Sequence, residues 1–84
     1  MEEKEVGKIT HYFTNLSVAV VDLSDELQVG DEIHIKGATT DFTQKVESMQ
    51  IEKQPIEKAK KGDVIGLKVT DRVREGDTVY KIVE

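Results

Sequence analysis

A Gly-Asp pair recurs three times in this chain, and each copy stands just before an apolar or alternating stretch. The copies are Gly30-Asp31, Gly62-Asp63 and Gly76-Asp77. Glycine reaches the positive φ angles that tight turns need, and the aspartate after it can accept hydrogen bonds from the turn's backbone amides. The unequal spacing of the copies argues against a true repeat. The pattern predicts three turns that each deliver the chain into a β-strand.

Period-two alternation supports the same conclusion. Ile33 and Ile35 alternate with Glu32, His34 and Lys36, which gives the segment one apolar and one polar face. A strand that is buried on one side requires this pattern. The segment 32–36 is therefore the clearest strand in the chain.

The N-terminal part of the chain predicts a β-hairpin with its turn near Asn15, because asparagine tolerates positive φ. Strict alternation places Ile9, His11 and Phe13 on one face and Tyr12 on the opposite face. Phe13 is therefore expected in the core, and Tyr12 is expected to be exposed to solvent.

Further strands are expected over residues 42–53, 64–69 and 79–83, with a phase shift inside the first of them. Only residues 56–61 have helical character, and so short a helix needs tertiary support. Short strands with turn signals at about ten-residue intervals predict an all-β fold, a small β-barrel of about six strands, closed or partly open. We expect residues 1–5, rich in Glu and Lys, to be disordered and residues 6–84 to form one domain.

Composition excludes several classes of function. A chain of 84 residues buries only about 60% of its unfolded surface, so it cannot enclose a large, deep active site. The absence of Cys excludes disulfides and thiolate metal sites. No apolar run approaches the roughly 18 residues of a membrane span, and the acidic start differs from a signal peptide. We expect a noncatalytic, cytoplasmic protein without a cofactor.

The charged residues indicate which partners the chain can bind and what kind of organism it comes from. The net charge is −5, from 17 acidic and 12 basic residues, which works against nonspecific binding to phosphate backbones. A local basic face is still compatible with this balance. The high charged fraction and the scarcity of Cys, Asn and Met are typical of heat-adapted proteins, so a thermophilic source is a hypothesis.

Six side chains are candidates for contact with RNA or with a protein partner. The candidates are Lys8, Tyr12, Lys36, Lys68, Arg72 and Arg74. The lysines and arginines would form one basic face if the strand order brings them together, and Tyr12 is the aromatic side chain available for stacking. The competing explanation is that lysines on strand exteriors keep the protein soluble.

The two histidines, His11 and His34, have no partners at metal-ligand or catalytic spacing, so we expect them to have structural roles. No serine motif or carboxylate pair suggests catalysis.

An ordered series of motifs resembles the second domain of elongation factor Tu, a β-barrel of the translation-protein type. The motifs are Gly7-Lys8-Ile9 and residues 27–37, 46–49 and 59–67. The resemblance implies a stand-alone binding barrel linked to translation, with RNA or a translation-associated protein as partner. The chain lacks the Gly-x-x-x-x-Gly-Lys-Ser/Thr loop, so no GTP binding is expected.

Two other resemblances give alternatives. Residues 40–49 and 76–81 are similar to the C-terminal barrel of the collagenase-like peptidases, which favours a protein-interaction or assembly module. Such a module would use an exposed apolar patch or an edge strand. Residues 47–51 resemble a lipoyl or biotinyl carrier domain, but Gln50 occupies the position of the modifiable lysine. The carrier therefore remains only an alternative for the fold.

Overall fold

The computed structural model describes residues 2–83, and this range contains ten β-strands and no helix, which confirms the all-β prediction. In chain order the strands are β1 (Glu2–Phe13), β2 (Val18–Leu23), β3 (Leu27–Gln28), β4 (Glu32–Lys36), β5 (Asp41–Lys45), β6 (Met49–Ile51), β7 (Gln54–Ile56), β8 (Lys58–Ala59), β9 (Val64–Lys68) and β10 (Thr78–Val83). Accordingly, residues 2–83 include no helix that is long and apolar enough to cross a membrane.

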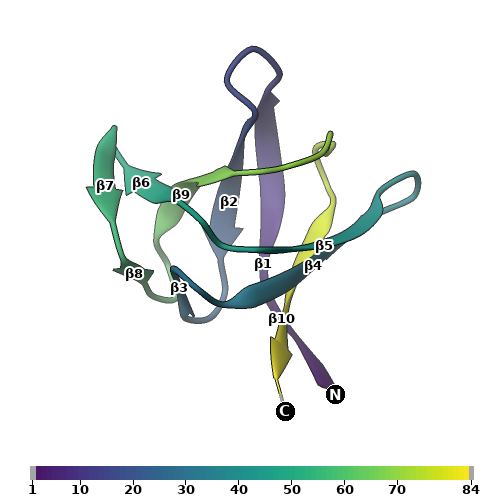
Figure 1. Ribbon diagram of the computed structural model, residues 1–84, viewed down its shortest axis with the longest axis horizontal. Helices are drawn as coiled ribbons and strands as arrows, with labels where there is room; N and C mark the ends of the chain where they lie inside the picture. The colour runs from purple at the N-terminus through teal and green to yellow at the C-terminus, as the bar shows by residue number, and fades with distance from the viewer. Residues whose placement is uncertain (1, 84) are drawn as a thin grey trace.

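Eight of these strands form one antiparallel sheet in the order β5-β4-β10-β1-β2-β9-β6-β7, and β3 pairs with β8. The sheet curls around a common interior, with both termini at one end and the β1–β2 turn at the other (Figure 1). Its two edges, β5 and β7, do not pair, so the backbone ladder does not close into a barrel. The count of six strands is not confirmed.

The chain is divided into more strands than the sequence indicates. The expected strand 42–53 is split into β5 and β6, and residues 54–59, read in part as helical, form β7 and β8 instead. Pro55 fits within β7 because β7 is an edge strand and needs no ladder bond on its outer side.

Buried apolar side chains from the inner face of the curled sheet and from its loops form a single core. Ile33 and Ile35 of β4 are fully buried between exposed Glu32 and Lys36, as the alternation predicts. Ile65 of β9 faces the same interior. The core therefore fills the inside of the curled sheet, and the outward positions of the strands form the molecular surface.

The three Gly-Asp turns share one hydrogen-bond arrangement. They span residues 28–31, 60–63 and 74–77. In each turn the first residue's N–H donates to Oδ2 of the aspartate at 2.8–3.1 Å, and its carbonyl accepts the aspartate N–H at 3.0–3.1 Å. The glycines have φ between 91 and 98°. The predicted roles of both residues are confirmed.

A β-bulge in β1 overturns the predicted faces of the first hairpin. The register with β2 shifts between Ile9 and His11. Ile9 is buried, but beyond the bulge the alternation is reversed. Tyr12 packs against the core, and Phe13 is 45% exposed. The extra residue in the strand is the physical reason, because it moves every later side chain to the other face.

The N-terminal segment also differs from the expectation of disorder over residues 1–5. Residues 2–5 belong to β1 and pair with β10, from Glu2 opposite Val83 to Glu5 opposite Tyr80. The Nζ atom of Lys4 lies 2.6 Å from the Asp25 carboxylate. The pairing strand comes from the other end of the sequence, so local composition does not reveal it. Met1 lies outside the described residues.

The side chain of Gln44 links the edge strand β5 to the segment that follows β9. Its Nε2 donates to the Lys68 carbonyl at 2.9 Å, and its Oε1 accepts from the Thr70 N–H at 2.8 Å and from the Thr70 hydroxyl at 3.1 Å. A side-chain amide thus provides, at this edge of the sheet, the donor and the acceptor that a neighbouring strand would supply.

His34 connects three strands through both of its ring nitrogens. Its Nδ1 lies 2.8 Å from Oε2 of Glu3 in β1, and its Nε2 is hydrogen-bonded to Oδ1 of Asp41 in β5. The bond to Asp41 raises the pKa of His34, and the bond to Glu3 adds to this against the opposing effect of burial. The same bond with His34 lowers the pKa of Asp41. His34 therefore has a structural role, as a side-chain bridge between β4 and its partners in β1 and β5.

We predict that Gln44→Ala lowers the free energy of unfolding by roughly 2 kcal/mol, because three hydrogen bonds of about 1 kcal/mol each are partly replaced by water. Gln44→Glu keeps the acceptor for Thr70 but loses the donor to Lys68, so its loss should be intermediate. Urea unfolding of the three proteins measures this order. A Gln44→Ala protein as stable as the parent would show that the link contributes nothing.

We also predict that stability depends on the protonation of His34. Because the folded pKa is raised, the contribution is complete below about pH 6.5 and is lost as the pH rises through the folded pKa. The lowered pKa of Asp41 gives a contribution that is present above about pH 4 and is lost as the pH falls through the folded value. The bridge should therefore stabilise the fold most between these limits.

An NMR titration of the His34 ring should give a midpoint above 6.5, and the fall in unfolding free energy on the alkaline side should be smaller in His34→Gln. A midpoint at or below 6.5, or an unchanged alkaline fall in the variant, would contradict the assignment.

Candidate interaction surface

An apolar groove of about 560 Å³ lies on the outer face of β2 and β9. Val18 and Val20 of β2 lie beside Lys68 and Gly66 of β9 in the register, and Val20 and Gly66 line the middle of the groove. The neighbouring strands in the sheet order are β1 on one side and β6–β7 on the other. The groove is therefore bounded by the first hairpin and by the β6–β7 hairpin.

The side chains that line this groove are unusually exposed for apolar residues. Phe13 is 45% exposed, Leu16 is 60% exposed and Val64 is 54% exposed. Val29, which is 39% exposed, lies in a turn outside the groove. Isolated exposed apolar residues are normal on proteins, but a contiguous set around a hollow makes this groove a candidate interaction site.

Gly66 keeps the groove open. A Cβ atom at this position would lie 3.0 Å from Cγ of Gln50 and 3.3 Å from Cγ1 of Val18. These contacts are tighter than ordinary van der Waals contacts, so even a methyl group would press on the two side chains beside it. The lack of a side chain at residue 66 leaves the space above β9 free.

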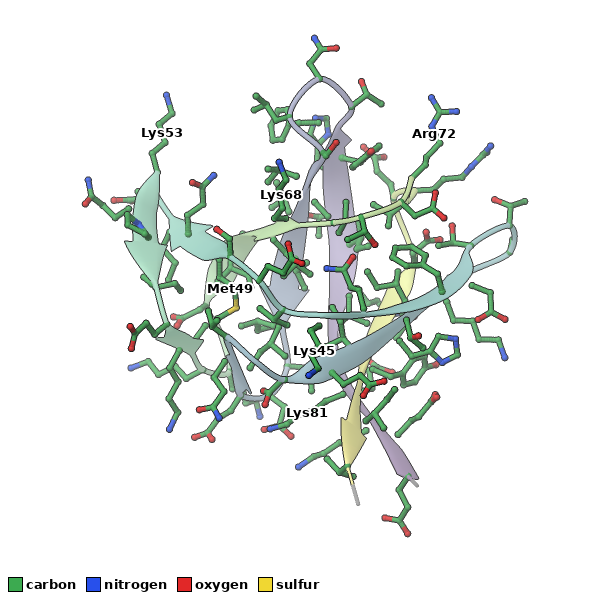
Figure 2. All side chains as sticks on the ribbon, in the orientation of Figure 1. Lys45, Met49, Lys53, Lys68, Arg72 and Lys81 are labelled. Atoms are coloured by element: carbon green, nitrogen blue, oxygen red, sulfur yellow. The ribbon has the colours of Figure 1, made fainter. Side chains whose placement is uncertain are left out.

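Backbone strain is concentrated at the rim of the groove. Within residues 2–83, the non-glycine residues with positive φ are Ser17 (54°), Glu52 (50°) and Lys53 (67°). Glu52 and Lys53 form the two-residue turn between Ile51 and Gln54, a geometry that usually selects Asn-Gly. Such strained residues cluster at functional sites. Lys53 projects away from the ribbon at this hairpin tip (Figure 2).

Two of the predicted basic residues, Lys8 and Lys36, share one row of the sheet. Both stand opposite Thr78, from β1 and from β4 respectively. Lys8 also pairs with Asp22, and Lys36 pairs with Asp41. Each lysine therefore has a carboxylate on its other side, and this part of the surface has alternating charge.

The other predicted residues lie elsewhere. Lys68 stands opposite Val18 beside the groove, and Tyr12 packs against the core, so it is not the exposed stacking residue that was expected. Arg72 and Arg74 lie in the loop between β9 and β10, and Figure 2 shows Arg72 well apart from Lys68 and on the opposite side from Lys53. The structure thus brings together Lys8 with Lys36 and Arg72 with Arg74. A binding role for these residues stays a prediction.

The arginine pair lines a second, polar hollow of about 260 Å³. The hollow lies between this loop and the start of β5, where Asp41 and Phe42 contribute to its wall. The Asp41 carboxylate there is already hydrogen-bonded to His34, which holds its pKa below the ordinary value.

Sequence reasoning missed the apolar groove. Leu16 could have indicated this surface, because an apolar residue in a hairpin turn next to Asn15 is unusual unless it contacts another apolar group. Phe13 carried the opposite signal, since alternation without the bulge placed it in the core. The remaining lining residues come together only through the register of four strands.

Comparisons with known proteins identify relatives of the chain. No protein-family model matches it. It is 42% identical over 81 residues to an uncharacterized protease of Methanocaldococcus jannaschii and 46% identical over 78 residues to a collagenase of Porphyromonas gingivalis. The matches cover 95% and 90% of this chain but only 20% and 22% of those proteins. The chain thus spans about a fifth of the length of these relatives.

A solved structure shows the same fold. The C-terminal domain of a Geobacillus thermoleovorans protein assigned to the U32 peptidases superimposes with a TM-score of 0.88, over 95% of this chain and 93% of that domain. The two sequences are 20% identical, so this likeness concerns the fold.

These relatives correct the expected function. They are named protease and collagenase, and the solved domain comes from a protein assigned to the U32 peptidases, so the expectation of an elongation-factor-like module linked to translation or RNA is wrong. The resemblance to elongation factor Tu is not supported. The resemblance to the C-terminal barrel of collagenase-like peptidases is confirmed: the chain is homologous to part of these proteins and has the fold of a U32 peptidase C-terminal domain.

Proposed function

We propose that this chain is a noncatalytic interaction module of a U32-peptidase-type protein, and that its apolar groove docks on the peptidase part of that protein. The observation that carries the proposal is the exposed groove, with Phe13, Leu16 and Val64 open to solvent. Solvent exposure of several large apolar side chains around one hollow has a free-energy cost that a docked surface would relieve.

The chemistry of the groove favours a protein surface as the occupant. Apolar side chains from four strands and a turn dominate its lining, and the two charges at its rim, Glu52 and Lys53, have opposite signs. A nucleic acid would require several Lys or Arg side chains in contact with phosphates. An apolar surface of another polypeptide satisfies the groove without such charges.

The size of the groove favours a partner in the same polypeptide. Eleven residues line it, whereas a stable interface between free proteins uses about 20–30 residues on each side. The groove alone would therefore hold a free partner weakly. In the two relatives about four-fifths of the chain lies outside the matched part, and a covalent tether gives such a neighbour an effective concentration of roughly millimolar. A small contact is sufficient under that condition.

We predict that the groove is covered when the chain is joined to the remaining part of a relative such as the Methanocaldococcus jannaschii protease. The chain has no Cys, so Leu16→Cys places a single thiol in the groove and Val29→Cys places one on an exposed apolar position outside it. The test compares maleimide labelling, read by peptide mass spectrometry, in the isolated chain and in a chimera where the chain replaces the matched part of the Methanocaldococcus jannaschii protease.

Labelling of Leu16→Cys should be at least about tenfold slower in the chimera, because the contact excludes solvent, while Val29→Cys should label equally in both contexts. As a second readout, Leu16→Lys with Val64→Lys should lower the melting temperature of the chimera and leave that of the isolated chain nearly unchanged. Equal labelling of Leu16→Cys in both contexts, with Val29→Cys also equal, would overturn the proposal.

A further inference from the structure

A second site, separate from the groove, lies where the β9–β10 loop faces the β4–β5 turn. It is the polar hollow of about 260 Å³. Its lining includes Thr39, Thr40, Asp41, Phe42, Arg72 and Arg74. This volume is slightly below the usual range of about 300–1,000 Å³ for small-molecule pockets, so the hollow suits a small group.

The loop presents both arginines on a fixed backbone. Val73, between them, is 2% exposed and anchors the loop in the core, so the flanking side chains face outward. The Arg74 N–H donates to Oδ2 of Asp77 at 2.8 Å, and the Arg72 N–H donates to Oδ1 of Asp71 at 2.8 Å. Binding a ligand here therefore needs little further ordering of the backbone.

The charges around the hollow leave the two guanidinium groups available. Among the described residues, neither Arg72 nor Arg74 forms an ion pair. The carboxylate of Asp41, which lines the hollow, is bound by the His34 imidazole. Asp71 is the other carboxylate in the lining, so the hollow holds two positive and two negative side chains. Of these four, only Asp41 takes part in an ion pair among the described residues.

The lining also matches the parts of a small organic anion. The guanidinium fork of arginine presents parallel N–H donors that fit the two oxygens of a carboxylate or phosphate. Thr39 and Thr40 provide hydroxyl groups, and the partly buried ring of Phe42 offers an apolar contact.

We propose that this hollow is an oxyanion-binding site, which takes a carboxylate or phosphate group of a small ligand between Arg72, Arg74 and the β4–β5 turn. The site is distinct from the apolar groove, because it lies on other elements and binds by charge. Figure 2 shows the Arg72 side chain pointing outward on the side of the molecule opposite the β6–β7 hairpin.

The test is an NMR titration of the intact chain that follows the arginine Nε–Hε signals and the backbone amides. Sodium acetate and sodium phosphate serve as separate probes, each exchanged against sodium chloride at constant ionic strength. We expect saturable shifts, in the roughly millimolar range for such small anions, at Arg72, Arg74 and residues 39–42. Stronger binding of acetate would identify a carboxylate site, and stronger binding of phosphate a phosphate site.

Two variants of equal charge change complete the experiment. Arg72→Ala with Arg74→Ala removes two positive charges from the hollow and should abolish saturation. Lys8→Ala with Lys68→Ala removes two positive charges elsewhere and should leave it unchanged. Shifts that do not saturate, or that weaken equally in both variants, would show general screening by ions and overturn the proposal. Because acetate and phosphate do not occupy the apolar groove, this outcome is independent of the labelling result.

Discussion

The fold depends on the hydrogen bonds of one buried aspartate. Asp77 is 4% exposed, and its Oδ2 holds the start of its own turn through the Arg74 N–H. Its carbonyl accepts the Ile9 N–H at 2.8 Å, and the Gly76 N–H donates to the Ile9 carbonyl at 2.7 Å, so the turn is fastened to the bulged part of β1. Its Oδ1 lies only 1.9 Å from the place where residue 37 would have a Cβ. Gly37 is therefore required for the carboxylate to sit against the β4–β5 turn.

The sequence predicted correctly those parts of the fold whose conformation is determined by residues only a few positions apart. Each Gly-Asp turn closes on itself over four residues, so the dipeptide is enough to recognise it. The alternation in β4 holds because its register has no irregularity. The bulge between Ile9 and His11 depends on the pairing of β1 with β2, and no local signal placed it. Phe13 and Tyr12 therefore exchanged faces relative to the prediction.

The candidate sites show the same division. Lysines and arginines could be named from the sequence, but only the strand order decides which of them are neighbours. Lys8 and Lys36 meet across Thr78 because β10 lies between β1 and β4, strands distant in sequence. The apolar groove needs four adjacent strands in register, so its residues could not be assembled in advance. Leu16, at 60% exposed, is the one lining residue whose apolar side chain is unexpected in a solvated turn.

The two proposed sites rest on different parts of this framework, and this separation has a functional meaning. The arginine hollow includes Arg74, whose backbone N–H is held by the buried Asp77. The groove is built on outward side chains of β2 and β9 and on two turns that contain non-glycine residues with positive φ. A docked peptidase domain could thus occupy the groove while the hollow stays open to a small anion. The chain would then carry ligand recognition and attachment at separate sites within only 84 residues.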